Sequence, residues 1–192
     1  MEHYQNGRLN EAEMLSMSIT KEFPLHQFAW KILGSVLKET GRITEALTCM
    51  LKSVQINPQD SDAHNNYGVM LQELGRLDDA VSSYSQSIIL EPYNIEAHKN
   101  LGNTFKDQGF LDKAIIAYNK AISINPDDSE SYYNMGVTLK LLGKFEEAIV
   151  SYNKAIELNP NYVEAHQNLS FVLLNCGKLS KGFDEYEWRW KK

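Results

Sequence analysis

The sequence has few cysteines and no long apolar run. Its two cysteines, Cys49 and Cys176, are too few for a disulfide framework, so nothing in the composition indicates an oxidising compartment. No segment approaches the roughly 18 consecutive apolar residues of a membrane-spanning helix, and the first residues lack the basic and apolar regions of a signal peptide. We therefore expect a cytoplasmic protein that does not enter a membrane.

Positive charge and catalytic motifs are scarce as well. The chain has 19 Lys and Arg against 25 Asp and Glu, a formal net charge of −6, whereas nucleic-acid binding normally requires a basic surface. Glycine loops for phosphate, nucleophile elbows and the HExxH zinc motif are missing from the sequence. We expect no nucleic-acid partner, no cofactor and no enzyme activity of this chain itself.

Proline and glycine are also infrequent, but their spacing is regular. The five prolines lie 34 residues apart, at Pro24, Pro58, Pro92, Pro126 and Pro160. Counted from Gln27 as repeat position 1, glycine occupies position 8 at Gly34, Gly68, Gly102 and Gly136, and position 15 at Gly7, Gly41, Gly75, Gly109, Gly143 and Gly177. The period predicts a partial repeat at 1–26, full repeats at 27–60, 61–94, 95–128 and 129–162, and a slightly divergent C-terminal repeat at 163–192.

Each repeat is expected to form two helices. Apolar residues recur at helical spacing on both sides of the position 15 glycine, for example Tyr67 and Leu71 before Gly75, and Ala80 and Tyr84 after it. That glycine favours the end of the first helix, and the proline ends the second. Residues with capping side chains are expected to start the first helices at Asp60, Asn94 and Asp128, and the second helices at Asn10, Thr44, Asp78, Asp112 and Ser180.

The period and its motif resemble those of tetratricopeptide repeats. In repeat 95–128 the motif is formed by His98, Leu101, Gly102, Phe105, Gly109, Ala114, Tyr118, Ala121 and Pro126, and the same spacing recurs in repeat 129–162. The resemblance covers essentially the whole chain. It implies an all-α fold, a right-handed α-solenoid of stacked helix-turn-helix units whose first helices line a concave groove.

Asparagine recurs in the middle of the predicted first helices, although it is a poor helix former. It occupies repeat position 6 at Asn66, Asn100, Asn134 and Asn168. Each amide offers an acceptor and a donor, which match the backbone groups of an extended peptide. We therefore predict a protein-interaction module, a scaffold or adaptor that binds an extended polypeptide in its groove. The alternative is that these amides hydrogen-bond neighbouring helices.

A similar asparagine row lines the tetratricopeptide superhelix of O-linked N-acetylglucosamine transferases. This resemblance implies an alternative function, in which the chain is the substrate-recruiting arm of a larger glycosyltransferase whose catalytic domain lies outside these 192 residues. Because the sequence starts and stops inside a repeat, we expect it to be a fragment of a longer protein.

Other polar residues of the first helices extend the predicted peptide-binding site. They are Asn65, Lys99, Asn103, Lys106 and Lys140. The lysines are suited to acidic side chains of a ligand, although simple solvation is the alternative explanation. Another tetratricopeptide class binds C-terminal carboxylates with a clamp that Lys99, Asn103 and Asn134 match in part. Its cationic half is absent here, since Glu164 and Asn168 occupy those places, so we do not expect such a clamp.

Histidines and terminal aromatics complete the set of candidate residues. His64, His98 and His166 share repeat position 4, and equivalent positions of packed helices lie too far apart to bind one zinc ion. We therefore expect packing histidines and no metal site. The last helix carries the aromatic residues Phe183, Tyr186, Trp188 and Trp190. For them we expect a covering segment outside this chain, end-to-end self-association, or folding back onto the last repeat.

Overall fold

The computed structural model describes residues 8–190, with side chains up to Trp188. Gly7, which was expected to end a helix, and the side chain of Trp190 lie outside the described part. Regular structure within residues 8–190 is helical throughout: α2 (Leu9–Glu22), α3 (Gln27–Glu39), α4 (Ile43–Ile56), α5 (Ser61–Glu73), α6 (Leu77–Leu90), α7 (Ile95–Asp107), α8 (Leu111–Ile124), α9 (Ser129–Leu141), α10 (Phe145–Leu158), α11 (Val163–Asn175), α12 (Leu179–Tyr186) and the short 3₁₀ helix η1 (Glu187–Trp190).

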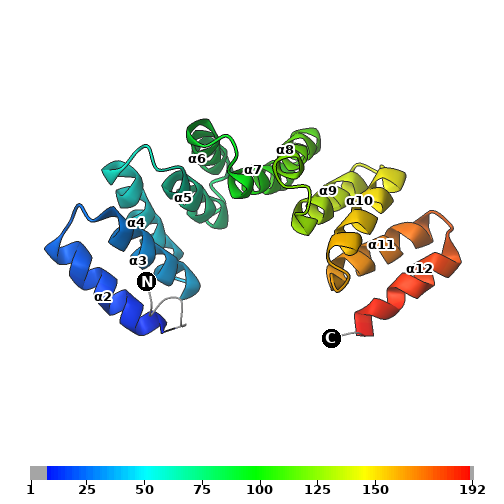
Figure 1. Cartoon of the computed structure of the whole chain (residues 1–192), viewed down its shortest axis with the longest axis horizontal. Helices are drawn as coiled ribbons and strands as arrows, with labels where there is room; N and C mark the ends of the chain where they lie inside the picture. The colour runs from blue at the N-terminus through cyan, green and yellow to red at the C-terminus, as the bar shows by residue number, and fades with distance from the viewer. Residues whose placement is uncertain (1–7, 191–192) are drawn as a thin grey trace. The chain divides into compact units, whose positions relative to one another are not determined.

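The chain divides into two compact units, Met1–Ala97 and His98–Lys192, with the boundary inside α7. In the N-terminal unit, helices that are consecutive along the chain pack against each other from α2 through to α6, and the same holds from α8 through to α12 in the C-terminal unit (Figure 1). Serial packing of antiparallel helices makes the fold a solenoid of helical repeats. The predicted all-α fold class is therefore confirmed.

The glycine at repeat position 15 forms the turn between the two helices of a repeat. Its φ lies between 72° and 80° at all five described positions, a left-handed conformation that residues with a side chain rarely adopt. Next to Gly41, the N–H of Arg42 bonds to the carbonyl of Leu37 over 2.8 Å, and that of Gly41 bonds to Lys38 over 2.9 Å. This is the Schellman pattern, and it confirms the predicted end of the first helix.

The predicted starts of the second helices are wrong. In α4 the residue that flanks the helix is Arg42, not Thr44, and its side chain makes no capping hydrogen bond. The Schellman turn explains the difference, because it uses Arg42 as its last residue and the next helix begins immediately at Ile43. The expected capping residues therefore lie inside the first turn of their helices, at Asn10, Thr44, Asp78, Asp112 and Ser180.

The first helices begin at the capping residues that were predicted from the sequence. A side-chain oxygen of Asp60 accepts a hydrogen bond from the N–H of Ala63 over 2.9 Å. Asn94 does the same for Ala97 over 3.0 Å, and Asp128 caps α9 in the same way. These three residues cap their helices as predicted.

Glycine at repeat position 8 allows the two helices of a repeat to pack closely. A Cβ atom at Gly102 would lie 2.6 Å from Cε1 of Tyr118, and one at Gly68 would lie 2.7 Å from Cε1 of Tyr84. Both tyrosine rings are fully buried, so the missing side chain makes room for an aromatic ring.

None of the helices within residues 8–190 is both long and apolar enough to cross a membrane.

Candidate functional site

The first helices of successive repeats form one face in each unit, here called the first-helix face. It comprises α3 and α5 in the N-terminal unit, and α9, α11 and the part of α7 from His98 onward in the C-terminal unit. Lys31 of α3 forms an ion pair of 3.2 Å with Asp60, the residue that caps α5. Lys99 of α7 pairs with Glu130 of α9 over 2.7 Å. Neighbouring first helices are therefore joined by charged contacts.

Asn134 is the predicted site residue with the most distinctive environment. It lies in the middle of α9, and only 8% of its surface is exposed. Within residues 8–190 its side-chain amide has no hydrogen-bond partner, although its backbone carbonyl accepts a bond from Thr138. Its amide atoms are not among the fully buried polar atoms without a partner, so they remain accessible from outside the protein although most of the residue is covered. The amide is thus available for a bound molecule.

Asn168, one repeat later, is engaged within the protein. Its Nδ2 donates to the hydroxyl of Tyr133 over 3.2 Å and to the carbonyl of Glu164 over 3.0 Å. Its Oδ1 accepts a hydrogen bond from Nζ of Lys140. Tyr133 and Lys140 belong to α9, so this amide ties α11 to α9. The alternative role foreseen for the asparagines, bonding to a neighbouring helix, therefore fits Asn168.

Of the remaining position 6 asparagines, Asn66 belongs to the N-terminal unit and Asn100 to the C-terminal unit. Asn66 is half-buried, makes no side-chain hydrogen bond to any residue the structure describes, and lines a hollow of about 210 Å³ with Ser35 and Lys38. Asn100 is half-buried and Asn65 is buried, and both interact with other groups of the protein.

The flanking residues of the predicted site have different roles. Lys99 is 6% exposed and lies near two carboxylates, those of Glu130 and Asp128, so it joins α7 to α9. Asn103 accepts a hydrogen bond of 2.7 Å from the hydroxyl of Tyr118. Lys106 is half-buried and has no ion pair with any described residue.

Lys140 is held in an unusual place. Its ammonium group bonds to Asn168 and lies 5.5 Å from the centre of the Phe171 ring, a cation–π distance. Burial lowers the pKa of this lysine, because a partly dehydrated cation is less stable than a hydrated one. The first-helix face of the C-terminal unit therefore contains a cation whose nearest partner is a neutral amide.

The tyrosines at repeat position 24 reveal a feature that the sequence analysis missed. The hydroxyl of Tyr84 donates to Gln72 over 3.0 Å, and that of Tyr118 donates to Asn103 over 2.7 Å. Tyr152 is equally buried, but among the described residues its hydroxyl has no hydrogen-bond partner. Repeat 129–162 thus contains two polar side chains without a partner for their polar groups, those of Asn134 and Tyr152.

The histidines pack in the protein interior or at its edge. His98 and His166 are buried, and His64 is half-buried with its ring nitrogen 3.0 Å from the carbonyl of Pro58. Among residues 8–190, no group of three or more His, Cys, Asp or Glu side chains is placed to hold a metal ion.

The C-terminal aromatics separate into two sets. The ring of Trp188 stacks on His166 with centroids 3.8 Å apart. This residue therefore folds back onto the last repeat, which is one of the three alternatives expected from the sequence. Phe183 and Tyr186 of α12 remain exposed. End-to-end association through them stays a prediction.

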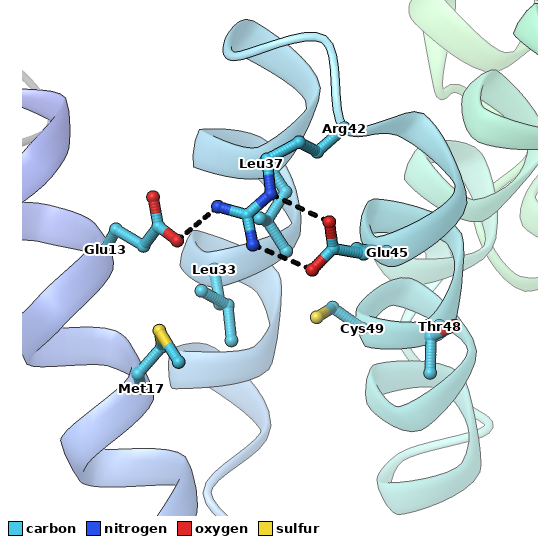
Figure 2. A pocket seen from close by; sticks show the side chains of 8 residues that line it. All are labelled: Glu13, Met17, Leu33, Leu37, Arg42, Glu45, Thr48 and Cys49. Carbon is cyan, nitrogen blue, oxygen red and sulfur yellow. Dashed lines mark hydrogen bonds and ion pairs between the residues drawn. The ribbon is translucent and has the colours of Figure 1, made fainter.

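A second hollow, of about 250 Å³, lies away from the asparagine row, between α2, α3 and α4. Figure 2 shows the guanidinium group of Arg42 between the carboxylates of Glu13 and Glu45, with Leu33 and Cys49 beside it. Because both ends of the cation are neutralised, Arg42 links α2 to α4. This hollow contains none of the predicted site residues.

Comparison with known proteins identifies the repeats. The helix pairs joined by left-handed glycine turns define a helical-repeat protein. Profiles of the tetratricopeptide repeat match residues 29–60, 49–82, 129–162 and 151–182, and a further TPR repeat profile matches residues 68–109 and 102–143. The chain therefore belongs to the tetratricopeptide repeat family. No curated protein matches the sequence.

Solved structures share the fold at low sequence identity. PilW, described as a widely conserved type IV pilus biogenesis factor, is 16% identical with a TM-score of 0.90, over 96% of this chain and 86% of PilW. MamA from Desulfovibrio magneticus is 19% identical with a TM-score of 0.75, over 84% and 91% of the two chains. YrrB, described as a TPR protein with an unusual peptide-binding site, is 15% identical with a TM-score of 0.69, over 90% and 89%. The resemblance to glycosyltransferase repeats stays a prediction.

Proposed function

We propose that this chain is a protein-interaction module that binds an extended polypeptide on its first-helix face. The tetratricopeptide repeat fold supports the proposal, since stacked repeats present long surfaces suited to a partner chain. YrrB, which has a similar fold, is described as having a peptide-binding site. The proposal for this chain depends, however, on its own residues.

The observation that carries the proposal is the side chain of Asn134. The residue is only 8% exposed, and its amide lacks a hydrogen-bond partner among residues 8–190. An extended peptide offers one N–H and one C=O per residue, and the amide of asparagine can bind both. Asn66 offers a similar amide in the N-terminal unit, next to a polar hollow. Binding through backbone groups predicts modest sequence preference.

The proposal is tested with peptides selected from a random dodecapeptide library displayed on phage. Asn134→Ala should weaken binding of the selected peptides about tenfold, because one or two hydrogen bonds with the peptide backbone are lost. Asn153→Ala is the matched control, since Asn153 lies exposed on α10, a second helix. Equal affinities of both variants, measured by fluorescence anisotropy with circular dichroism as a check of folding, would contradict the proposal.

The alternative, a substrate-recruiting arm of a glycosyltransferase, uses the same face and differs only in what the chain is attached to. The full reading frame distinguishes the two functions. A nucleotide-sugar domain encoded in the same frame favours the arm, and its absence from that frame favours an adaptor.

A further inference from the structure

The lysines of the first-helix face differ in whether they have an acidic partner. Lys31, Lys38 and Lys99 each pair with a carboxylate at 2.7 to 3.2 Å. Lys106 and Lys140 have no carboxylate within ion-pair distance in the part of the chain that the structure describes. Both of them belong to the C-terminal unit.

The repeat pattern explains this difference. Lys38, Lys106 and Lys140 share repeat position 12, and Lys38 pairs over 3.2 Å with Glu73, which occupies position 13 of the next repeat. Position 13 is Leu141 in the repeat that follows Lys106, and it is Asn175 in the repeat that follows Lys140. The carboxylate that neutralises position 12 in the N-terminal unit is therefore replaced by uncharged residues in the C-terminal unit.

The residue that replaces the acid does not engage Lys140. The Nδ2 of Asn175 donates to the carbonyl of Phe171 in its own helix over 2.8 Å, and the side chain makes no hydrogen bond with Lys140. The ring of Phe171 is 55% exposed and lies beneath the ammonium group at 5.5 Å from its centre. Asn168, fixed by Tyr133 and Glu164, supplies the only oxygen that accepts a hydrogen bond from Lys140 among the described residues.

We propose that the peptide bound by the C-terminal unit carries an acidic side chain that pairs with Lys140, next to an apolar side chain that packs on Phe171. The inference deepens the proposed function and rests on it. The ligand carboxylate takes the part that Glu73 plays for Lys38 in the N-terminal unit. A carboxylate beside a partly dehydrated ammonium group forms a strong, charge-assisted hydrogen bond. Lys106, at the same position one repeat earlier, adds positive charge along the same face.

The probe is again the set of peptides selected from the random dodecapeptide library. We expect Asp or Glu next to an apolar residue to be enriched among them. Lys140→Met, which keeps the length of the side chain but removes its charge, should weaken binding of such a peptide about tenfold. Lys120→Met, at an exposed position of the second helix α8, is the control and should leave affinity unchanged. Lys140→Arg should retain most of the affinity.

Two further variants locate the contact. Replacing the acidic residue of the peptide by its amide should weaken binding to the parent chain as much as Lys140→Met does. The same peptide change should not weaken binding to the Lys140→Met variant, since both changes remove one and the same interaction. Asn175→Glu introduces at repeat position 13 the acid that Glu73 provides in the N-terminal unit. The new carboxylate should form an ion pair with Lys140 and lower the affinity for the acidic peptide. The pKa of Lys140, followed by NMR, should rise when the acidic peptide binds and stay unchanged with the amide form.

The outcomes separate this inference from the proposed function. Peptides that need Asn134, show no acidic enrichment and bind Lys140→Met normally would overturn the acidic contact alone. Peptides that bind independently of Asn134, or a library that yields no binder, would overturn both.

Discussion

The hydroxyl of Tyr118 donates a 2.7 Å hydrogen bond to the side chain of Asn103. Tyr152 occupies the same position one repeat later, where Val137 replaces the asparagine, and its buried hydroxyl lacks a partner in the described structure. Two equally buried tyrosines thus differ in whether the hydroxyl is hydrogen-bonded, which makes them a matched pair for experiment.

Tyr118→Phe should lower the free energy of unfolding by about 1 kcal/mol, the typical net contribution of one hydrogen bond. Tyr152→Phe should cause no loss, or a gain of up to about 1 kcal/mol, because it removes a buried hydroxyl that has no partner. Urea denaturation of both variants measures the difference. Equal losses in the two variants would show that the hydroxyl of Tyr152 is satisfied in solution.

Gly102 tests the close approach of the two helices in a repeat. Gly102→Ala should destabilise the protein by about 1–3 kcal/mol, because the new methyl group meets the fully buried ring of Tyr118. Asn119→Ala, on the exposed side of α8, should change stability by less than about 0.5 kcal/mol. Thermal denaturation compares the two, and a neutral Gly102→Ala would contradict the packing.

Asp60 couples stability to pH. Burial opposes ionisation of this carboxyl, but hydrogen bonds from the N–H of Ala63 and from Lys31 outweigh it and hold its pKa below the ordinary 3.8. A carboxyl with a lowered pKa stabilises the folded state above its unfolded pKa, and this contribution is lost as the pH falls through the folded pKa. Asp60→Asn should retain the helix cap, as Asn94 does, but lose the charge.

The difference in unfolding free energy between the parent chain and Asp60→Asn should therefore be largest near neutral pH. It should shrink as the pH falls below about 4. Asp62→Asn, at an exposed neighbouring position, serves as the control. A difference that stays constant down to about pH 2 would contradict the role of the Asp60 charge.

The two thiols should react at different rates. Cys49 is buried, and burial raises the pKa of its thiol to about 11, so little thiolate forms at neutral pH. Cys176 is half-buried. In the folded protein, Ellman's reagent should modify Cys176 first, and Cys176→Ser should remove the fast phase. A fast phase that survives this substitution would place the reactive thiol at Cys49.

The repeat itself could be predicted from the sequence because its determinants are local. Gly41 ends a helix and Gly102 admits Tyr118 for reasons of backbone conformation and size, and both recur at a fixed spacing. The starts of the second helices could not be predicted from capping preferences, because the Schellman turn leaves no residue between Arg42 and the helix.

The candidate site could be predicted only in part. The position of Asn134 on α9 follows from the period, but whether an amide is free depends on residues one repeat away. Asn168 is engaged because Tyr133 and Lys140 lie opposite it. Lysine recurs at position 12, but the period does not specify which of these lysines contacts an amide of the next repeat. The neutralisation of Lys99 by Glu130 likewise depends on rotamers and distances between helices, which the repeat pattern alone does not specify.

The most direct test of the central claim is the side-chain NH₂ signal of Asn134 in nitrogen-15 NMR during titration with a selected peptide. This signal should shift strongly and saturate with the binding curve, while the NH₂ signal of Asn153 on α10 stays in place. A saturating peptide that moves signals of the second helices and leaves the NH₂ signal of Asn134 unchanged would contradict binding on the first-helix face.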